Sequence, residues 1–72
     1  MTPGENLKAR RAAANLTQEQ LAEATGVTRT ALSRFEHPTH PRRITGDSAI
    51  KLAEYFQCPL SEFFIPRGKH GV

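Results

Sequence analysis

The sequence predicts a small all-α domain, and three observations lead to this prediction. Apolar residues recur at helical spacing in several segments, and these segments are separated by residues that favour helix ends. No segment alternates apolar and polar residues between hairpin-type turn signals, as strands do. The chain has 72 residues, which suffice for one domain. We therefore expect five short helices in one domain over residues 5–65, followed by a flexible C-terminal tail over residues 66–72.

The first helix is expected over residues 5–14, which are rich in good helix formers. At helical spacing Leu7, Arg10, Arg11 and Ala14 fall on one face of this helix. A guanidinium group therefore lies beside the apolar stripe. In that position it requires a carboxylate partner.

The second helix is expected over about residues 18–25. Thr17 and Gln20 have the spacing of a capping box at its start. Gly26 stands where a helix C-terminus favours positive φ, and Val27 then provides an apolar anchor. A tight turn into a third helix follows from this arrangement.

The third helix begins near Thr28, which is suited to cap it. Its inward residues are expected to be Ala31, Leu32 and Phe35. The residues expected to point away from the core are Arg29, Thr30, Ser33, Arg34 and His37. The exposed face of this helix is therefore short, polar and cationic.

A basic loop, residues 37–46, separates the first three helices from the rest of the chain. Thr45 or Asp47 is suited to cap a fourth helix. Its apolar stripe is formed by Ala49, Leu52, Ala53 and Phe56. The fifth helical element is a final turn from Pro59 to Phe64.

Phe63 and Phe64 are adjacent and so point about 100° apart on a helix. One small core has little room for two rings that point in different directions. Two interpretations stay open: both rings cap the core from one end, or one of them contributes to a dimer contact.

Composition and charge favour a basic domain outside the membrane. Ten Lys and Arg residues against seven Asp and Glu residues give a net charge of +3, and the pI is about 9.6. A pI this high fits a nucleic-acid-binding domain. Cys58 is a single cysteine, and neither a signal peptide nor an apolar run of about 20 residues is seen. We expect a cytoplasmic protein.

Metal binding and catalysis have little support in the sequence. The candidate ligands His37, His40, His70 and Cys58 match no zinc-site spacing, so Cys58 is interpreted as structural. No local sequence frames Ser33 or Ser61 as a nucleophile. We expect no cofactor, no metal and no enzymatic activity.

Two helices joined by a tight turn, with a cationic second helix, suit the major groove of DNA. An α-helix fits this groove, where Arg pairs with guanine and Thr or Ser offers hydrogen bonds. The N-terminal end of such a helix reaches deepest, which favours Arg29 and Thr30, with Ser33 and Arg34 one turn later. Arg42 and Arg43 in the basic loop are predicted to contact phosphates.

The segment TQEQLAEATGVTRTALSRFE, residues 17–36, resembles the helix-turn-helix of the Cro and phage-repressor family, the lambda-repressor-like domains. The segment RRITGDSAIKLAEYFQCPLSEFF resembles the loop, fourth helix and closing turn of small regulators in the same family. The resemblance covers about residues 6–65.

This resemblance implies roles for further residues. Gln18 matches a side chain that hydrogen-bonds a DNA phosphate, and Thr17 and Thr28 lie at helix starts that also suit phosphate. Arg11 and Glu36 match a family ion pair between the first helix and the end of the third. His37, expected to point outward at the end of the third helix, is also predicted to contact a phosphate.

The chain also departs from the family. Pro38 stands where members commonly have glycine, and proline cannot adopt positive φ. We therefore expect the third helix to end differently from its relatives.

Two functions are consistent with these features. The first is a sequence-specific transcriptional regulator, more simply a repressor than an activator, that binds a palindromic operator as a homodimer. Its half-sites would lie about 34 Å apart. The alternative is a helix-turn-helix module that binds a protein, such as an antitoxin-type regulator.

Overall fold

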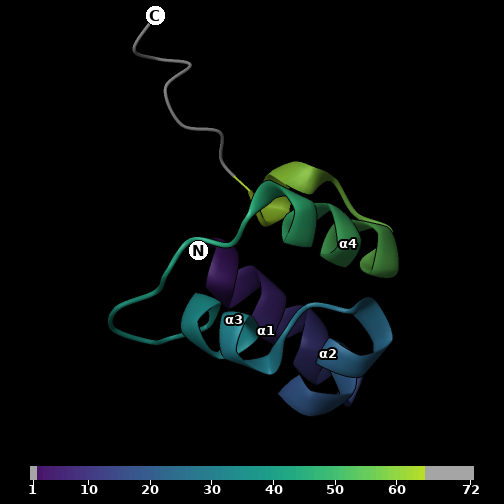
Figure 1. The fold of residues 1–72 in the computed structure, drawn as a ribbon, viewed down its shortest axis with the longest axis horizontal. Helices are drawn as coiled ribbons and strands as arrows, with labels where there is room; N and C mark the ends of the chain where they lie inside the picture. Colours follow the sequence, from purple (N-terminus) through teal and green to yellow (C-terminus); the bar gives the residue numbers. More distant parts are fainter. Residues whose placement is uncertain (1, 65–72) are drawn as a thin grey trace, which may run out of the picture.

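The computed structural model describes residues 2–64 (Figure 1). Its elements are the α-helices α1 (Pro3–Ala13), α2 (Gln18–Thr25), α3 (Arg29–Phe35) and α4 (Gly46–Phe56), and the 3₁₀ helix η1 (Leu60–Glu62). No strand occurs within residues 2–64, and this confirms the all-α prediction. None of the helices in this range is long and apolar enough to cross a membrane.

The expected number of five helices is wrong, because the closing segment does not form a fifth α-helix. Pro59 precedes only three residues of 3₁₀ helix, and the amide of Phe63 then bonds the carbonyl of Leu60 at 3.0 Å. Phe63 turns into the core at this point, 1% exposed. The end of the expected domain at residue 65 and the expected tail, residues 66–72, lie outside the described residues.

Threonine side chains cap all four α-helices. Helix α1 begins two residues earlier than expected, because Thr2 and Glu5 form a capping box. The hydroxyl of Thr2 accepts from the amide of Glu5 at 3.1 Å, and the carboxylate of Glu5 accepts from the amide of Thr2 at 2.8 Å. Thr17 and Gln20 form the expected capping box on α2. At α4 the cap is Thr45 rather than Asp47.

The turn between α2 and α3 depends on Gly26. This residue has φ +82°, a left-handed conformation in which glycine carries no steric cost. Val27 follows it and is buried, 3% exposed. Thr28 then caps α3 by accepting from the amide of Ala31 at 3.1 Å. Turn and cap together fix the angle at which α3 leaves α2.

The core joins every element of the fold. Its five largest fully buried side chains come one from each α-helix and one from the residue after η1: Leu7, Leu21, Leu32, Leu52 and Phe63. Each such side chain contributes about 1.5–3 kcal/mol of hydrophobic stabilisation. In Figure 1, α1 lies in the middle, with α2 and α3 on one side and α4 with η1 on the other. The inner face of α3 thus packs against the core of the domain, while its outer face remains at the surface.

The start of α1 lies directly against the end of α3. A Cβ atom added to Gly4 would clash with the carbonyl oxygen of Phe35, so only glycine permits this approach. The following residue, Glu36, has φ −88° and ψ 5°, so α3 ends without a left-handed residue. This agrees with the different helix end that Pro38 predicted.

Candidate nucleic-acid interface

The outer face of α3 presents polar and cationic side chains to solvent. Leu32 and Phe35 are buried and Ala31 is half-buried, as the periodicity predicted. The exposed residues of this helix are Arg29, Thr30, Ser33 and Arg34. The four predicted base-contacting residues therefore share one solvent-facing surface.

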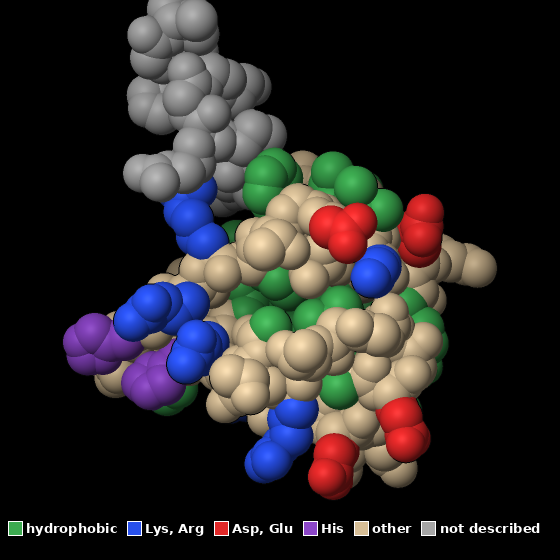
Figure 2. All heavy atoms as spheres, viewed as in Figure 1, with side chains coloured by type: hydrophobic (Ala, Val, Ile, Leu, Met, Phe, Trp, Pro, Cys, Tyr) green, Lys and Arg blue, Asp and Glu red, His purple; other side chains and the backbone are tan. Residues whose placement is uncertain are grey.

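The loop after α3 folds back beside this surface. The amide of Arg42 donates to the carbonyl of Arg34 at 2.9 Å, which ties the loop to the last turn of α3. Arg34, Arg42 and Arg43 then line one shallow hollow with Ala31 and Pro41. Figure 2 shows Lys and Arg side chains gathered on the side of the loop, next to the histidines. We call Arg34, Arg42 and Arg43 the basic cluster.

The basic cluster keeps its positive charge uncompensated. Within residues 2–64, neither the three arginines of the cluster nor Arg29 lies within ion-pair distance of a carboxylate. All four side chains are exposed. A polyanion approaching this side of the domain meets cations that no internal carboxylate holds.

The N-termini of α2 and α3 carry the threonines expected to contact phosphate. The hydroxyl oxygens of Thr17 and Thr28 accept from Gln20 and Ala31, at 3.0 and 3.1 Å. A hydroxyl group that accepts in this way still has its own O–H to donate. Both residues are exposed, so that O–H can reach a phosphate oxygen.

Gln18 has an internal partner that sequence reasoning did not find. Its Nε2 donates to Glu36 Oε1 at 3.2 Å, and the side chain is half-buried. An amide group has two N–H donors, so one remains for a second acceptor. Gln18 therefore connects the start of α2 to the end of α3 as well as lying at a helix N-terminus.

Glu36 is the centre of a buried polar network. Arg11 donates to both of its carboxylate oxygens, at 2.8 and 3.0 Å, and to the carbonyl of Leu16 at 2.8 Å. The Glu36 side chain is 3% exposed and that of Arg11 16%. The hydrogen bonds to Glu36 raise the pKa of Arg11. The network joins α1, α2 and α3 behind the outer face of α3.

A second ion pair joins α1 to η1 and was not predicted. Arg10 donates to both carboxylate oxygens of Glu62 at 2.8 Å. These bonds lower the pKa of Glu62 and raise that of Arg10. Cys58 lies nearby, packed against the core, and burial raises the pKa of its thiol. A thiol held in its neutral form fits the structural role expected for this cysteine.

The ring of His37 forms hydrogen bonds with the backbone at the tip of the loop. His37 Nδ1 accepts from the amides of Thr39 and His40, at 3.2 and 3.0 Å. This arrangement leaves Nε2 as the protonated ring nitrogen of neutral His37. His37 is exposed beside the basic cluster, and its predicted phosphate contact would use that N–H. No group of three metal-ligating side chains occurs within residues 2–64, and His70 lies outside them.

Two helices joined at Gly26, with a cationic second helix on the surface, define the class of DNA-binding helix-turn-helix domains. The model of the helix-turn-helix family matches residues 7–63. The chain therefore belongs to this family, the Cro and phage-repressor type of DNA-binding regulator. Members of this family regulate by binding DNA rather than by catalysis. Neither the curated proteins nor the solved structures compared with the chain give a match.

Besides the Arg10–Glu62 pair, sequence reasoning missed three features, and one of them had a local signal. Thr2, Pro3 and Glu5 form a recognisable capping-box start, which was overlooked. The bond from Gln18 to Glu36 and the approach of Gly4 to Phe35 have no such signal. Both join residues that only the packing of the helices brings together.

Proposed function

We propose that this DNA-binding regulator reads sequence in the major groove with α3. The observation that carries the proposal is the exposed row of Arg29, Thr30, Ser33 and Arg34 on a helix whose other face is buried. A helix in the groove offers its N-terminal residues to base edges, and Arg recognises guanine bidentately. Arg29 and Thr30 are therefore the primary base-contacting residues in this proposal, followed by Ser33 and Arg34.

Phosphate contacts are assigned to the surroundings of α3. Thr17, Gln18 and Thr28 are proposed to bind one strand through helix N-termini and their free side-chain donors. Arg42 and Arg43 of the loop, with His37, are proposed to bind the other side of the groove. Such contacts fix position and supply affinity that does not depend on sequence.

A homodimer on a palindromic operator is proposed for the complex. The support is a small exposed apolar patch formed by Ile50 of α4 and Leu60 of η1, which are 44% and 39% exposed and line one hollow. Figure 2 shows apolar side chains at the surface over this part of the fold. Phe63 is in the core and Phe64 is half-buried, so this patch supports a dimer better than either phenylalanine.

Repression is the direction of regulation we propose, and the cytoplasm is the proposed location. A dimer that covers its operator blocks other proteins from overlapping sites without any further contact. Two half-sites about 34 Å apart place both copies on one face of the duplex.

Selection of binding sites from a randomised duplex pool at physiological salt tests the proposal. We expect one palindromic motif to be enriched. For the variant Arg29→Ala we expect relaxed preference at one position, because a bidentate contact provides about 1–3 kcal/mol of discrimination. Lys51→Ala is the matched control, since Lys51 is an exposed cation on α4 that pairs with Asp47 at 3.6 Å. It should enrich the same motif as the parent.

Two outcomes would contradict this function. Absence of any enriched motif would favour the alternative, a module that binds a protein through the same fold. The surface of α3 gives that alternative less support, because its two large apolar residues, Leu32 and Phe35, are 0% and 4% exposed. Equal effects of Arg29→Ala and Lys51→Ala would show that the loss is one of charge alone.

A further inference from the structure

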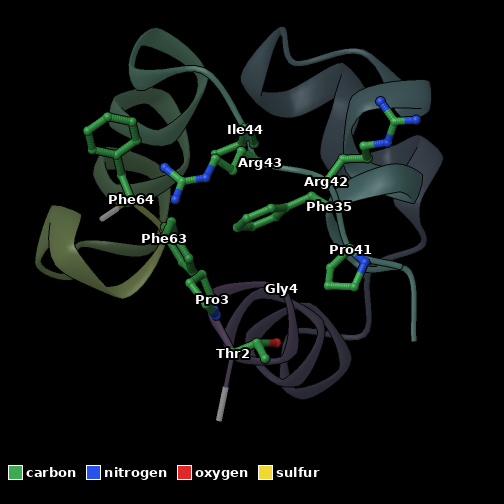
Figure 3. Close-up of a pocket in the computed structure, with 10 residues that line it drawn as sticks. All are labelled: Thr2, Pro3, Gly4, Phe35, Pro41, Arg42, Arg43, Ile44, Phe63 and Phe64. Atoms are coloured by element: carbon green, nitrogen blue, oxygen red, sulfur yellow. The ribbon is translucent and has the colours of Figure 1, made fainter. Parts of the chain in front are cut away.

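An apolar cavity lies between the start of α1, the end of α3 and the loop that leads to α4 (Figure 3). Its volume is about 260 Å³. Rings and aliphatic groups from distant segments form its walls: Pro3, Phe35, Pro41, Ile44, Phe63 and Phe64. The cavity is slightly below the range of about 300–1,000 Å³ typical of drug-sized ligands, so it suits a smaller molecule with one ring or a short chain.

The charges at this cavity are positive. Arg42 and Arg43 both line it, but Figure 3 shows only the guanidinium of Arg43 directed toward Phe63 and Phe64, whereas that of Arg42 points away. Within residues 2–64, no Asp or Glu is among the residues that line it. An apolar cavity with these charges is complementary to a molecule with an apolar body and one negative charge.

We propose that the cavity binds a small amphipathic monoanion, an aromatic or short aliphatic carboxylate. Its apolar body replaces water against the rings of Phe35 and Phe63, and its carboxylate pairs with Arg43 at the rim. Residues 65–72 are a less suitable occupant, because Arg67 and Lys69 give that segment the same sign of charge as Arg43.

The position of the cavity connects ligand binding to DNA binding, and this step rests on the proposed function. Phe35 ends α3, and the stretch from Pro41 to Ile44 is the loop that carries Arg42 and Arg43. A guanidinium paired with a carboxylate at the cavity is withdrawn from a DNA phosphate. The ligand therefore lowers DNA affinity by the equivalent of one phosphate contact, which reduces the salt slope by about 0.9.

The first experiment measures ligand binding without DNA. The full chain labelled with ¹⁵N is titrated with 3-phenylpropanoate, and with 3-phenylpropan-1-ol as its neutral counterpart. We expect saturable shifts of amide signals from cavity residues at millimolar acid, and weaker binding of the alcohol. Arg43→Gln should lower the affinity for the acid about three- to fivefold, as expected for loss of an exposed ion pair.

Two further variants separate the cavity from general charge. Arg42→Gln changes the same charge at a side chain that points away, and should leave acid binding unchanged. Pro41→Trp places a large ring at an exposed wall residue and should abolish binding of acid and alcohol alike. Pro41 has no backbone N–H to lose, so this variant keeps the hydrogen bonds of the loop.

Several results would overturn the proposal. One is the absence of saturable shifts; another is equal binding of acid and alcohol, or equal loss in Arg43→Gln and Arg42→Gln. Binding that occurs only after removal of residues 65–72 would assign the cavity to the end of the chain itself. If the ligand binds normally but DNA affinity does not change, only the proposed effect of the ligand on DNA binding is overturned. If the protein does not bind DNA at all, the proposed function fails, but the result of the ligand titration still stands.

Discussion

The arginines of α1 and those of α3 with its following loop are used in opposite ways. Arg10 donates two hydrogen bonds to the carboxylate of Glu62 in η1, and Arg11 donates two to that of Glu36 at the end of α3. Arg29 and the basic cluster have no carboxylate partner within the described residues. All of these side chains carry the same charge, so residue type does not distinguish the two groups.

The difference shows which positive charges hold the fold and which remain for a ligand. An arginine that forms two hydrogen bonds with one carboxylate directs those donors and much of its electrostatic field at that partner. An exposed arginine without one keeps both for a polyanion. Net charge therefore says less about DNA binding than the distribution of pairing, and each prediction below tests one side of this comparison.

The largest effect is expected from Arg11→Ala. It leaves the carboxylate of Glu36, 3% exposed, without its charge partner, and breaking a buried pair in this way costs about 3–5 kcal/mol. Urea unfolding followed by circular dichroism measures the loss. Arg10→Ala breaks the half-buried pair that the neighbouring residue forms with Glu62, and it should cost much less. Equal losses would show that burial of the partner does not decide the role of these arginines.

A smaller loss of stability is expected from Gly4→Ala. The added Cβ meets a backbone carbonyl, that of Phe35, which cannot rotate away as a side chain does. Moving α1 away from α3 should cost about 1–3 kcal/mol, as overpacking does. The same denaturant titration measures it, with Gly46→Ala as control, because a Cβ there meets only the ring of Phe64 at 3.7 Å. Equal stabilities of the two variants would argue against the close packing of α1 on α3.

On the side of the unpaired arginines, Arg42→Gln should weaken DNA binding without changing stability. Removal of one phosphate contact lowers the slope of log affinity against log salt by about 0.9 for every DNA sequence. Fluorescence anisotropy at several salt concentrations, on an operator and an unrelated duplex, measures this slope. A loss confined to the operator would mean that Arg42 contacts bases instead.

The smallest effect concerns pH. Pairing with Arg10 lowers the pKa of Glu62, so this carboxylate stabilises the fold above its unfolded pKa of about 4.3. That contribution is lost as the pH falls through the folded pKa. Thermal unfolding from neutral pH to about pH 3 should therefore show parent and Glu62→Gln converging at the acidic end. Glu54→Gln, at an exposed residue of α4, is the control and should follow the parent throughout.

Much of the fold was predictable from the sequence, and so was the surface composition of α3. The spacing of Ala31, Leu32 and Phe35 decides which face of α3 is buried and so which residues remain outside. The closing turn was overestimated, because the pattern around Pro59 does not distinguish a 3₁₀ turn from a short helix. The contacts of each α3 residue with DNA stay predictions.

The sequence by itself determined the features that depend on neighbours within about four residues: helix caps, helix faces and the left-handed turn at Gly26. The tertiary structure alone decided that Arg10 pairs with Glu62, that Gly4 touches α3, and that a cavity opens beside Arg43. Arg10 and Glu62 are 52 residues apart. Contacts over such distances depend on how the helices pack, and helical periodicity specifies the buried face of each helix without specifying what packs against it.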